Sequence, residues 1–209
     1  MTTTNCLCDS GDGGLYGQNA VYATAHSTVG TLYGGIKHYV GQGVSGGVYY
    51  IYRIFMKFDT SVIPDSDTIT QVNMKLVAVG DLTAKDFDVV IKKADWSAYD
   101  PASSANKDSI YDLILSASSD THIWRNTNGM SLNTQYTSGN LDTAWVNKSG
   151  YTYYGLISSR DISSTEPSSE EDIQIASQNH GTSGYRPILT ITHLPVGGHP
   201  VAVSPFFNI

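Results

Sequence analysis

The strongest constraint on the fold of this chain is an alternation of side chains over residues 49–64, which read YYIYRIFMKFDTSVIP. Successive side chains of a β-strand point to opposite faces, so alternate residues share a face. One face of this segment then carries Tyr50, Tyr52, Ile54, Met56 and Phe58. We predict a strand over residues 48–59 with this face on the core.

The following segment alternates in the same way. Residues 69–79 predict a second strand, whose apolar face consists of Val72, Met74, Leu76 and Ala78. Between the two strands lie Pro64 and Asp65, which are residues typical of turns. Two half-buried strands joined by a turn predict an antiparallel sheet with one face on a core.

The rest of the chain contains further short strand signals. We predict strands over residues 87–94, 151–159, 172–177 and 187–194, a short strand near 122–124, and one or two short strands within 21–47. The glycine-rich segment 41–47 predicts a loop. Residues 108–116 fit a strand or a short helical turn, and residues 141–146 fit a short helix or the start of a strand. With seven to nine short strands and no long helix, the predicted fold is all-β: an antiparallel β-sandwich of the jelly-roll type.

A chain of 209 residues predicts one domain flanked by tails. Residues 1–20 are rich in Thr, Gly and Asp, and we predict that they form an N-terminal arm. We predict that residues 21–194 form the jelly-roll domain and that residues 195–209 form a C-terminal arm. The C-terminal arm carries the apolar residues Val201, Val203, Phe206, Phe207 and Ile209. These side chains are expected either to pack back on their own domain or to insert into a neighbouring subunit.

The charge of the chain argues against two classes of partner. The formal net charge is −7, and the 12 Lys and Arg residues are scattered. Nucleic acids and anionic membrane surfaces both favour clustered positive charge, so we predict neither as a partner. No apolar run approaches the roughly 20 residues that span a bilayer.

The N-terminal sequence lacks the basic and apolar regions of a secretory signal peptide. This favours either a cytoplasmic product assembled without secretion or a processed chain to which Met1 was added. Cys6 and Cys8 have a C-x-C spacing that is poor for a disulfide bond. We interpret them as two thiols in a flexible tail, with an intermolecular bridge or partner contact as the alternative.

Several of these segments together match a known pattern. The matching positions are Arg53, Phe58, Asp59, Ser61, Ile63 and Pro64, followed by GLISSRDIS (155–163), DIQIAS (172–177) and YRPILTITH (185–193). The chain resembles the DNRLRE-type modules, also described as disaggregatase-related domains, over most of residues 20–193. The resemblance implies a jelly-roll β-sandwich similar to carbohydrate-binding modules, which occur in cell-surface proteins, polysaccharide-degrading enzymes and phage structural proteins. Some members bind acidic polysaccharides, and no catalytic residues belong to the module.

Metal and catalytic signals in the sequence are weak. The six histidines lack the spacing of a metal site. Jelly-roll modules often hold a structural calcium ion, for which the candidate ligands here are Asp59, Glu170, Glu171 and Asp172, and the DSGDGG segment at 9–14 is a weaker candidate. The only three Glu residues lie in one polar loop, and no G-x-S-x-G motif is present. We predict that the protein is not an enzyme and requires no cofactor.

Aromatic side chains are the remaining candidates for ligand binding, because sugar rings stack on exposed aromatic faces. The candidates are Tyr49, Tyr99, Trp124, Tyr136, Tyr153 and Tyr154, each with core packing as its alternative. Arg53 could contact an anionic partner, although a cross-strand ion pair is the favoured interpretation.

These observations favour a non-enzymatic structural protein of a bacteriophage virion, such as a capsid decoration, head-fibre or tail-surface component. We expect it to assemble in the host cytoplasm as a homo-oligomer, to contact other virion proteins through its arms and to be able to bind surface polysaccharide. The alternative is a carbohydrate-binding module of a secreted or cell-surface protein. A polysaccharide lyase or hydrolase is the least favoured interpretation.

Overall fold

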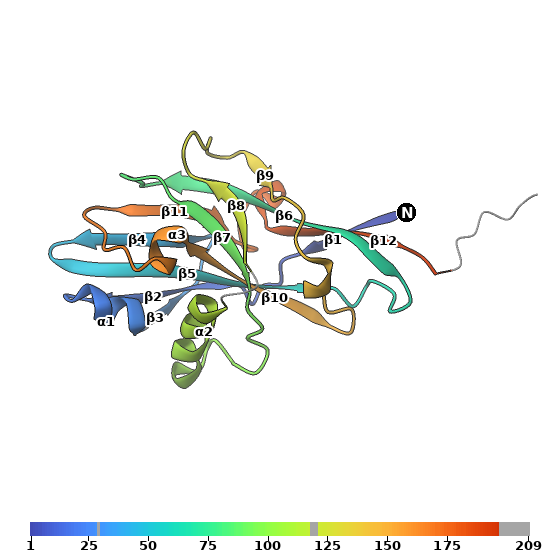
Figure 1. The fold of residues 1–209 in the computed structure, drawn as a ribbon, viewed down its shortest axis with the longest axis horizontal. Helices are drawn as coiled ribbons and strands as arrows, with labels where there is room; N and C mark the ends of the chain where they lie inside the picture. Colours follow the sequence, from blue (N-terminus) through green and yellow to red (C-terminus); the bar gives the residue numbers. More distant parts are fainter. Residues whose placement is uncertain (29, 118–120, 197–209) are drawn as a thin grey trace, which may run out of the picture.

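The computed structural model describes residues 1–28, 30–117 and 121–196, and Figure 1 shows its fold. The strands are β1 (Thr2–Leu7), β2 (Gly13–Asn19), β3 (Thr31–Tyr33), β4 (Lys37–Ser45), β5 (Val48–Asp59), β6 (Thr68–Asp81), β7 (Asp88–Lys93), β8 (Thr121–Asn126), β9 (Gln135–Thr137), β10 (Tyr151–Ser158), β11 (Glu171–Ala176) and β12 (Ile188–Leu194). The helices are α1 (Tyr22–Ser27), α2 (Ser104–Ser116) and α3 (Ser159–Ile162), with single 3₁₀ turns at Thr143–Trp145 and Ser183–Tyr185. None of these described helices is long and apolar enough to cross a membrane.

The strands form one antiparallel sheet in the order β1-β12-β6-β11-β4-β5-β10-β7-β8. Off this path, β2 pairs with β5, β3 pairs with β2, and β9 pairs with β6. The sheet curls into a sandwich-like fold, because one core cluster joins strands from both ends of this order. Met74 and Ile191 contribute to the cluster from one end, and Ile91 and Leu156 contribute from the other. The prediction of an all-β antiparallel sandwich is confirmed.

The sheet divides near the middle of β5. β4 pairs with β5 as far as Tyr52, and β10 takes over from Ile54 onwards. Gly41, the partner of Tyr52, has a φ of 128°, and a Cβ there would lie 2.3 Å from the carbonyl oxygen of Glu171. Glycine is therefore required where β4 separates from β5.

A second core cluster lies on the other face of β5, where α2 covers the sheet beside β10 and β2 (Figure 1). Ile51 and Phe55 of β5 pack there with Ile110 and Ile114 of α2. The alternation in the sequence predicts one buried face for β5, whereas the middle of this strand is buried on both faces. The segment 108–116, which fitted either a strand or a short helical turn, lies in the 13-residue helix α2.

The prediction of an N-terminal arm over residues 1–20 is wrong. β1 pairs along its whole length with β12, and β2 pairs with β5. Cys6 and Cys8 are free thiols buried in the main core, rather than thiols in a flexible tail. These polar strands join the sheet because their backbone groups complete the hydrogen bonding of β12 and β5. Cys6 of β1 and Leu15 of β2 are buried, whereas Leu7 of β1 is exposed.

The loop prediction for residues 41–47 is also wrong for most of its length. β4 continues to Ser45, held between β5 and β11, and only Gly46 and Gly47 form the turn, with φ values of 57° and 77°. The expected C-terminal arm, including Val201, Val203, Phe206, Phe207 and Ile209, lies outside the described residues except for positions 195 and 196.

Candidate functional site

Five tyrosines gather where β2, β3, β4 and β5 meet, and they line a hollow of about 240 Å³. This tyrosine hollow consists of Tyr16, Tyr33, Tyr39, Tyr50 and Tyr52, all of them half-buried. The rings of Tyr39 and Tyr52 lie 5.2 Å apart, and those of Tyr50 and Tyr52 are nearly parallel at 6.3 Å and 8°. The described residues therefore place several aromatic faces around one concave surface.

Strand register brings these tyrosines together. Tyr16 of β2 lies opposite Tyr52 of β5, and Tyr33 of β3 lies opposite Gly14 of β2. A Cβ on Gly14 would lie 2.1 Å from Cζ of Tyr33, so the ring of Tyr33 occupies the space that a side chain would need. The Tyr33 hydroxyl donates to the carbonyl of Tyr39 at 3.1 Å and accepts from its N–H at 2.7 Å, which holds this ring in place.

An acidic hollow of about 250 Å³ adjoins the tyrosine hollow and shares Tyr50 and Tyr52 with it. Its acidic residues are Glu170 and Asp172, and Asp172 is only 3% exposed. Burial, the charge of Glu170 and the charge of Asp81 raise the pKa of Asp172 to about 7. The Asp172 Oδ1 atom has no hydrogen-bond partner within the described part of the chain.

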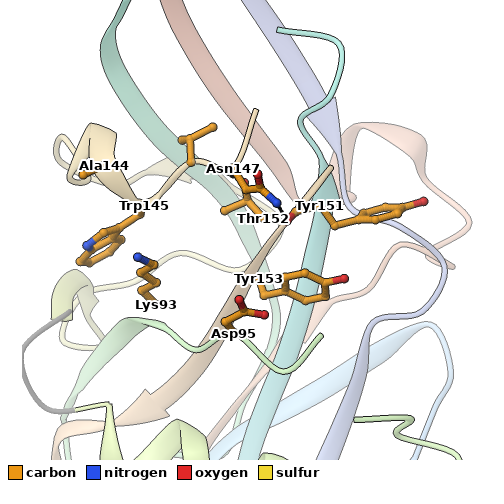
Figure 2. A pocket seen from close by; sticks show the side chains of 9 residues that line it. Lys93, Asp95, Ala144, Trp145, Asn147, Tyr151, Thr152 and Tyr153 are labelled. Carbon is orange, nitrogen blue, oxygen red and sulfur yellow. Dashed lines mark hydrogen bonds between the residues drawn. The ribbon is translucent and has the colours of Figure 1, made fainter. Parts of the chain in front are cut away.

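A second aromatic pocket, of about 220 Å³, lies between the end of β7, the 3₁₀ turn at 143–145 and β10 (Figure 2). Lys93 and Asp95 give it charges of both signs. Tyr153, a candidate from the sequence, lines this pocket, but its ring packs edge-on against Trp96 at 4.8 Å. Trp145 is 7% exposed. This pocket therefore offers less aromatic surface than the tyrosine hollow.

A wider pocket of about 520 Å³ lies beside His26 and Lys92. Lys92 donates to the carbonyl of Ala117 at 2.6 Å, and burial lowers its pKa. The Nε2 atom of His26 lies 3.0 Å from Oδ1 of Asp161. Both polar side chains are thus already engaged by the protein, which leaves them poorly placed to bind a ligand.

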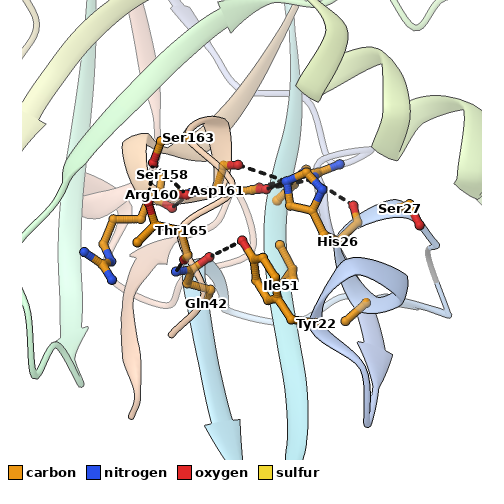
Figure 3. A network of polar contacts seen from close by, with 12 residues as sticks. Tyr22, His26, Ser27, Gln42, Ile51, Ser158, Arg160, Asp161, Ser163 and Thr165 are labelled. Atoms are coloured by element: carbon orange, nitrogen blue, oxygen red, sulfur yellow. Dashed lines mark hydrogen bonds and ion pairs between the residues drawn. The ribbon is translucent and has the colours of Figure 1, made fainter. Parts of the chain in front are cut away.

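The buried charges around Arg53 form a network that joins α1 and α3 to β5. Figure 3 shows two members of this network, His26 of α1 and Asp161 of α3. Arg53 donates from Nε to Asp161 Oδ2 at 2.7 Å and from Nη2 to Oδ1 at 2.8 Å, while His26 Nε2 lies 3.0 Å from Oδ1. Arg53 also donates to the carbonyl of Tyr111 at 2.8 Å, with its guanidinium 3.6 Å from the centre of that ring. The expected ion pair exists, but its acid lies on α3 rather than on a neighbouring strand.

Asp161 and His26, the two groups of this network that titrate near neutral or acidic pH, each stabilise the charged form of the other. Burial opposes ionisation of Asp161, but the charge and hydrogen bonds of Arg53, with the hydrogen bond of His26, lower its pKa. The hydrogen bond to Asp161 raises the pKa of His26. Each of the three side chains is committed to a partner within the fold, which indicates a structural role.

The other aromatic candidates from the sequence do not form a common site. Tyr154 and Trp124 are 0% and 5% exposed and belong to the main core, so their prediction as sugar platforms is wrong. Tyr49 and Tyr99 pack against the second core cluster, and Tyr136 packs against the main core. The tyrosine hollow was not predicted from the sequence, although Tyr50 and Tyr52, two of its five residues, alternate along one predicted strand face.

The four candidate calcium ligands are not brought together. Asp59 lies about 23 Å along β5 from the position that pairs beside Asp172. Glu171 is bound by Arg160, with Nε donating to Oε2, while Glu170 and Asp172 line the acidic hollow. Among the described residues, no group of three or more His, Cys, Asp or Glu side chains could hold a metal ion.

Comparison of the sequence with protein-family models finds no match, and comparison with curated proteins finds none either. The resemblance to DNRLRE-type modules therefore stays a prediction.

Proposed function

We propose that this protein is a non-catalytic carbohydrate-binding β-sandwich that holds a saccharide in the tyrosine hollow. The observation that carries the proposal is the convergence of five tyrosine rings on one concave surface. Aromatic rings offer an apolar face to the C–H groups of a sugar and a polar hydroxyl to its oxygens. Ligand sites are typically concave and largely apolar, with a few polar groups that fix orientation.

The arrangement of the rings supports an extended ligand. Tyr50 and Tyr52 lie two residues apart on β5, and their rings are nearly parallel. Two aromatic faces of similar orientation suit successive units of a chain. The hydroxyls of Tyr16 and Tyr39 make no hydrogen bond to other described residues, so they are free to bond sugar hydroxyls, whereas that of Tyr33 is used within the fold.

The test is calorimetric titration of the full chain with neutral and charged oligosaccharides. We expect Tyr50→Ala to weaken binding about tenfold or more, because the loss of a stacked ring costs roughly 1–2 kcal/mol. Tyr49→Ala is the matched control, since Tyr49 neighbours Tyr50 but packs against the second core cluster. Equal losses in both variants, or no binding by the parent protein, would refute the proposal.

The virion role predicted from the sequence depends on residues 195–209, most of which lie outside the described part of the chain. It stays a prediction, as do the homo-oligomer and the contacts with other virion proteins. Light scattering of the full chain and of a chain ending at residue 194 would test it, because loss of the arm should abolish assembly.

A further inference from the structure

The acidic hollow holds a carboxylate without a partner beside the tyrosine rings. Asp172 is 3% exposed, and its Oδ1 atom has no hydrogen-bond partner among the described residues. Buried carboxylates in proteins are normally paired or hydrogen-bonded. Asp172 lines a hollow of about 250 Å³ together with Tyr50 and Tyr52, so a ligand bound there could supply the missing partner.

The charges around Asp172 are negative. Glu170 lines the same hollow, and Asp81 of β6 acts on Asp172 from the neighbouring strand. The described residues that line the two hollows include no Lys or Arg. Lys85, with its Nζ 3.9 Å from Glu171 Oε1, is directed elsewhere. The site is therefore built to attract positive charge.

The tyrosine rings favour the same kind of ligand. The face of an aromatic ring carries partial negative charge, so it attracts an ammonium group placed over it. A carboxylate beside aromatic faces thus combines two attractions for one cationic group. The neighbouring phenols Tyr52 and Tyr33 stay neutral, because burial raises the pKa of each above its ordinary value.

We infer that the site selects saccharides that carry protonated amino groups, with Asp172 pairing with the ammonium while the tyrosine rings stack on the sugar. This inference rests on the proposed carbohydrate-binding function and names the class of saccharide. An acidic polysaccharide, which the family resemblance suggests, would be repelled by Glu170 and Asp172. A neutral saccharide would offer no counter-charge to the Asp172 carboxylate, so the raised pKa of this group would not fall.

A bound metal ion is a weaker explanation of the acidic hollow. Calcium takes six to eight oxygen ligands, whereas only two carboxylates line this hollow. In the part of the chain that the structure describes, no three or more His, Cys, Asp or Glu side chains are grouped so that they could hold a metal ion.

The experiment compares three hexasaccharides with the same β-1,4-linked glucose backbone, whose C2 substituent is a hydroxyl, an N-acetylamino or a free amino group. Titrations at pH 7 and low salt should show the amino form binding at least tenfold tighter than the hydroxyl form. Added salt should weaken only the amino form, because it screens the ion pair. Asp172→Asn should lower the affinity for the amino form about tenfold and change that for the hydroxyl form less than twofold.

Two further variants make the result specific. Asp95→Asn removes the same charge from the pocket of Figure 2 and should leave all three affinities unchanged. If Asp172→Asn does not fold, Glu170→Gln tests the same point, because Glu170 is exposed and lines the hollow. It should lower the affinity for the amino form about threefold.

The outcomes separate this inference from the proposed function. Equal affinity for all three hexasaccharides, with the expected loss in Tyr50→Ala, would overturn the charge selection and leave carbohydrate binding intact. Preference for the amino form that survives Asp172→Asn but is lost in Asp95→Asn would move the selectivity to the other pocket and also overturn the inference. Failure to bind any of the three would overturn both.

Discussion

Replacing Asp172 with Asn should make the protein more stable at neutral and alkaline pH. The pKa of this carboxyl is about 7 in the fold and 3.8 as its ordinary value. Between these two values the folded state binds more protons than the unfolded state, so the free energy of unfolding falls as pH rises from about 4 to 7. Above pH 7 the full loss has occurred, at about 1.4 kcal/mol for each unit of pKa difference.

The magnitude follows from the part of this window that can be measured. The range from pH 4.5 to pH 7 is about 2.5 pH units wide, and over it the parent protein should lose roughly 3 kcal/mol of its free energy of unfolding through Asp172. Asparagine has nearly the same shape and cannot ionise, so the variant avoids this loss. The stability of Asp172→Asn relative to the parent should therefore rise by roughly 3 kcal/mol between pH 4.5 and pH 8.

Urea unfolding followed by tryptophan fluorescence at pH 4.5, 6, 7 and 8 measures this difference. Asp95→Asn is the control and should show no such trend, because Asp95 is exposed. If the curves of Asp172→Asn and the parent stay parallel across this pH range, then Asp172 is not a desolvated carboxyl. The argument that it awaits a cationic partner would then fail as well.

Three further predictions concern the hollow, the buried network and the core. Gly14→Ala should weaken saccharide binding about tenfold in a calorimetric titration while the fold is kept, because the new Cβ would displace the ring of Tyr33. An unchanged affinity would contradict the packing of Tyr33 against Gly14. Asp161→Ala should lower the free energy of unfolding, measured by urea denaturation, by about 3–5 kcal/mol, because it leaves the Arg53 guanidinium buried without its carboxylate partner. A loss below about 1 kcal/mol would count against this ion pair. Burial raises the pKa of the Cys8 thiol well above its ordinary value, so a thiol reagent at pH 8 should modify Cys8 only after denaturation. Rapid labelling of the native protein would show that Cys8 does not lie in the core.

The long central strands could be predicted because their side chains alternate strongly. The predicted strand over 48–59 matches β5, and the one over 151–159 matches β10 to within one residue. β1 and β2 could not be predicted in this way, since TTTNCL and GGLYGQN contain few apolar residues. Their place in the sheet depends on hydrogen bonds to the backbone of distant strands, which leave no periodic signal in the sequence.

The candidate site was harder to predict for a related reason. Alternation showed that Tyr50 and Tyr52 share a face with Ile54, but it does not show how far the opposite layer covers that face. Tyr16 and Tyr33 reach the same hollow through the register of β2 and β3. The partner of Arg53 lies 108 residues away in the sequence, beyond the reach of local patterns.

The pairing of β1 with β12 determines how this protein can be attached to a surface. Thr2 lies opposite His193, which pairs with Ile69 at the start of β6, whereas Asp81 at the far end of β6 lies beside the acidic hollow. The twelve residue steps from Ile69 to Asp81 span about 40 Å of strand. A tether fixed to Met1 would thus hold the molecule by the end remote from the tyrosine hollow and would leave the proposed saccharide site accessible to long polymers.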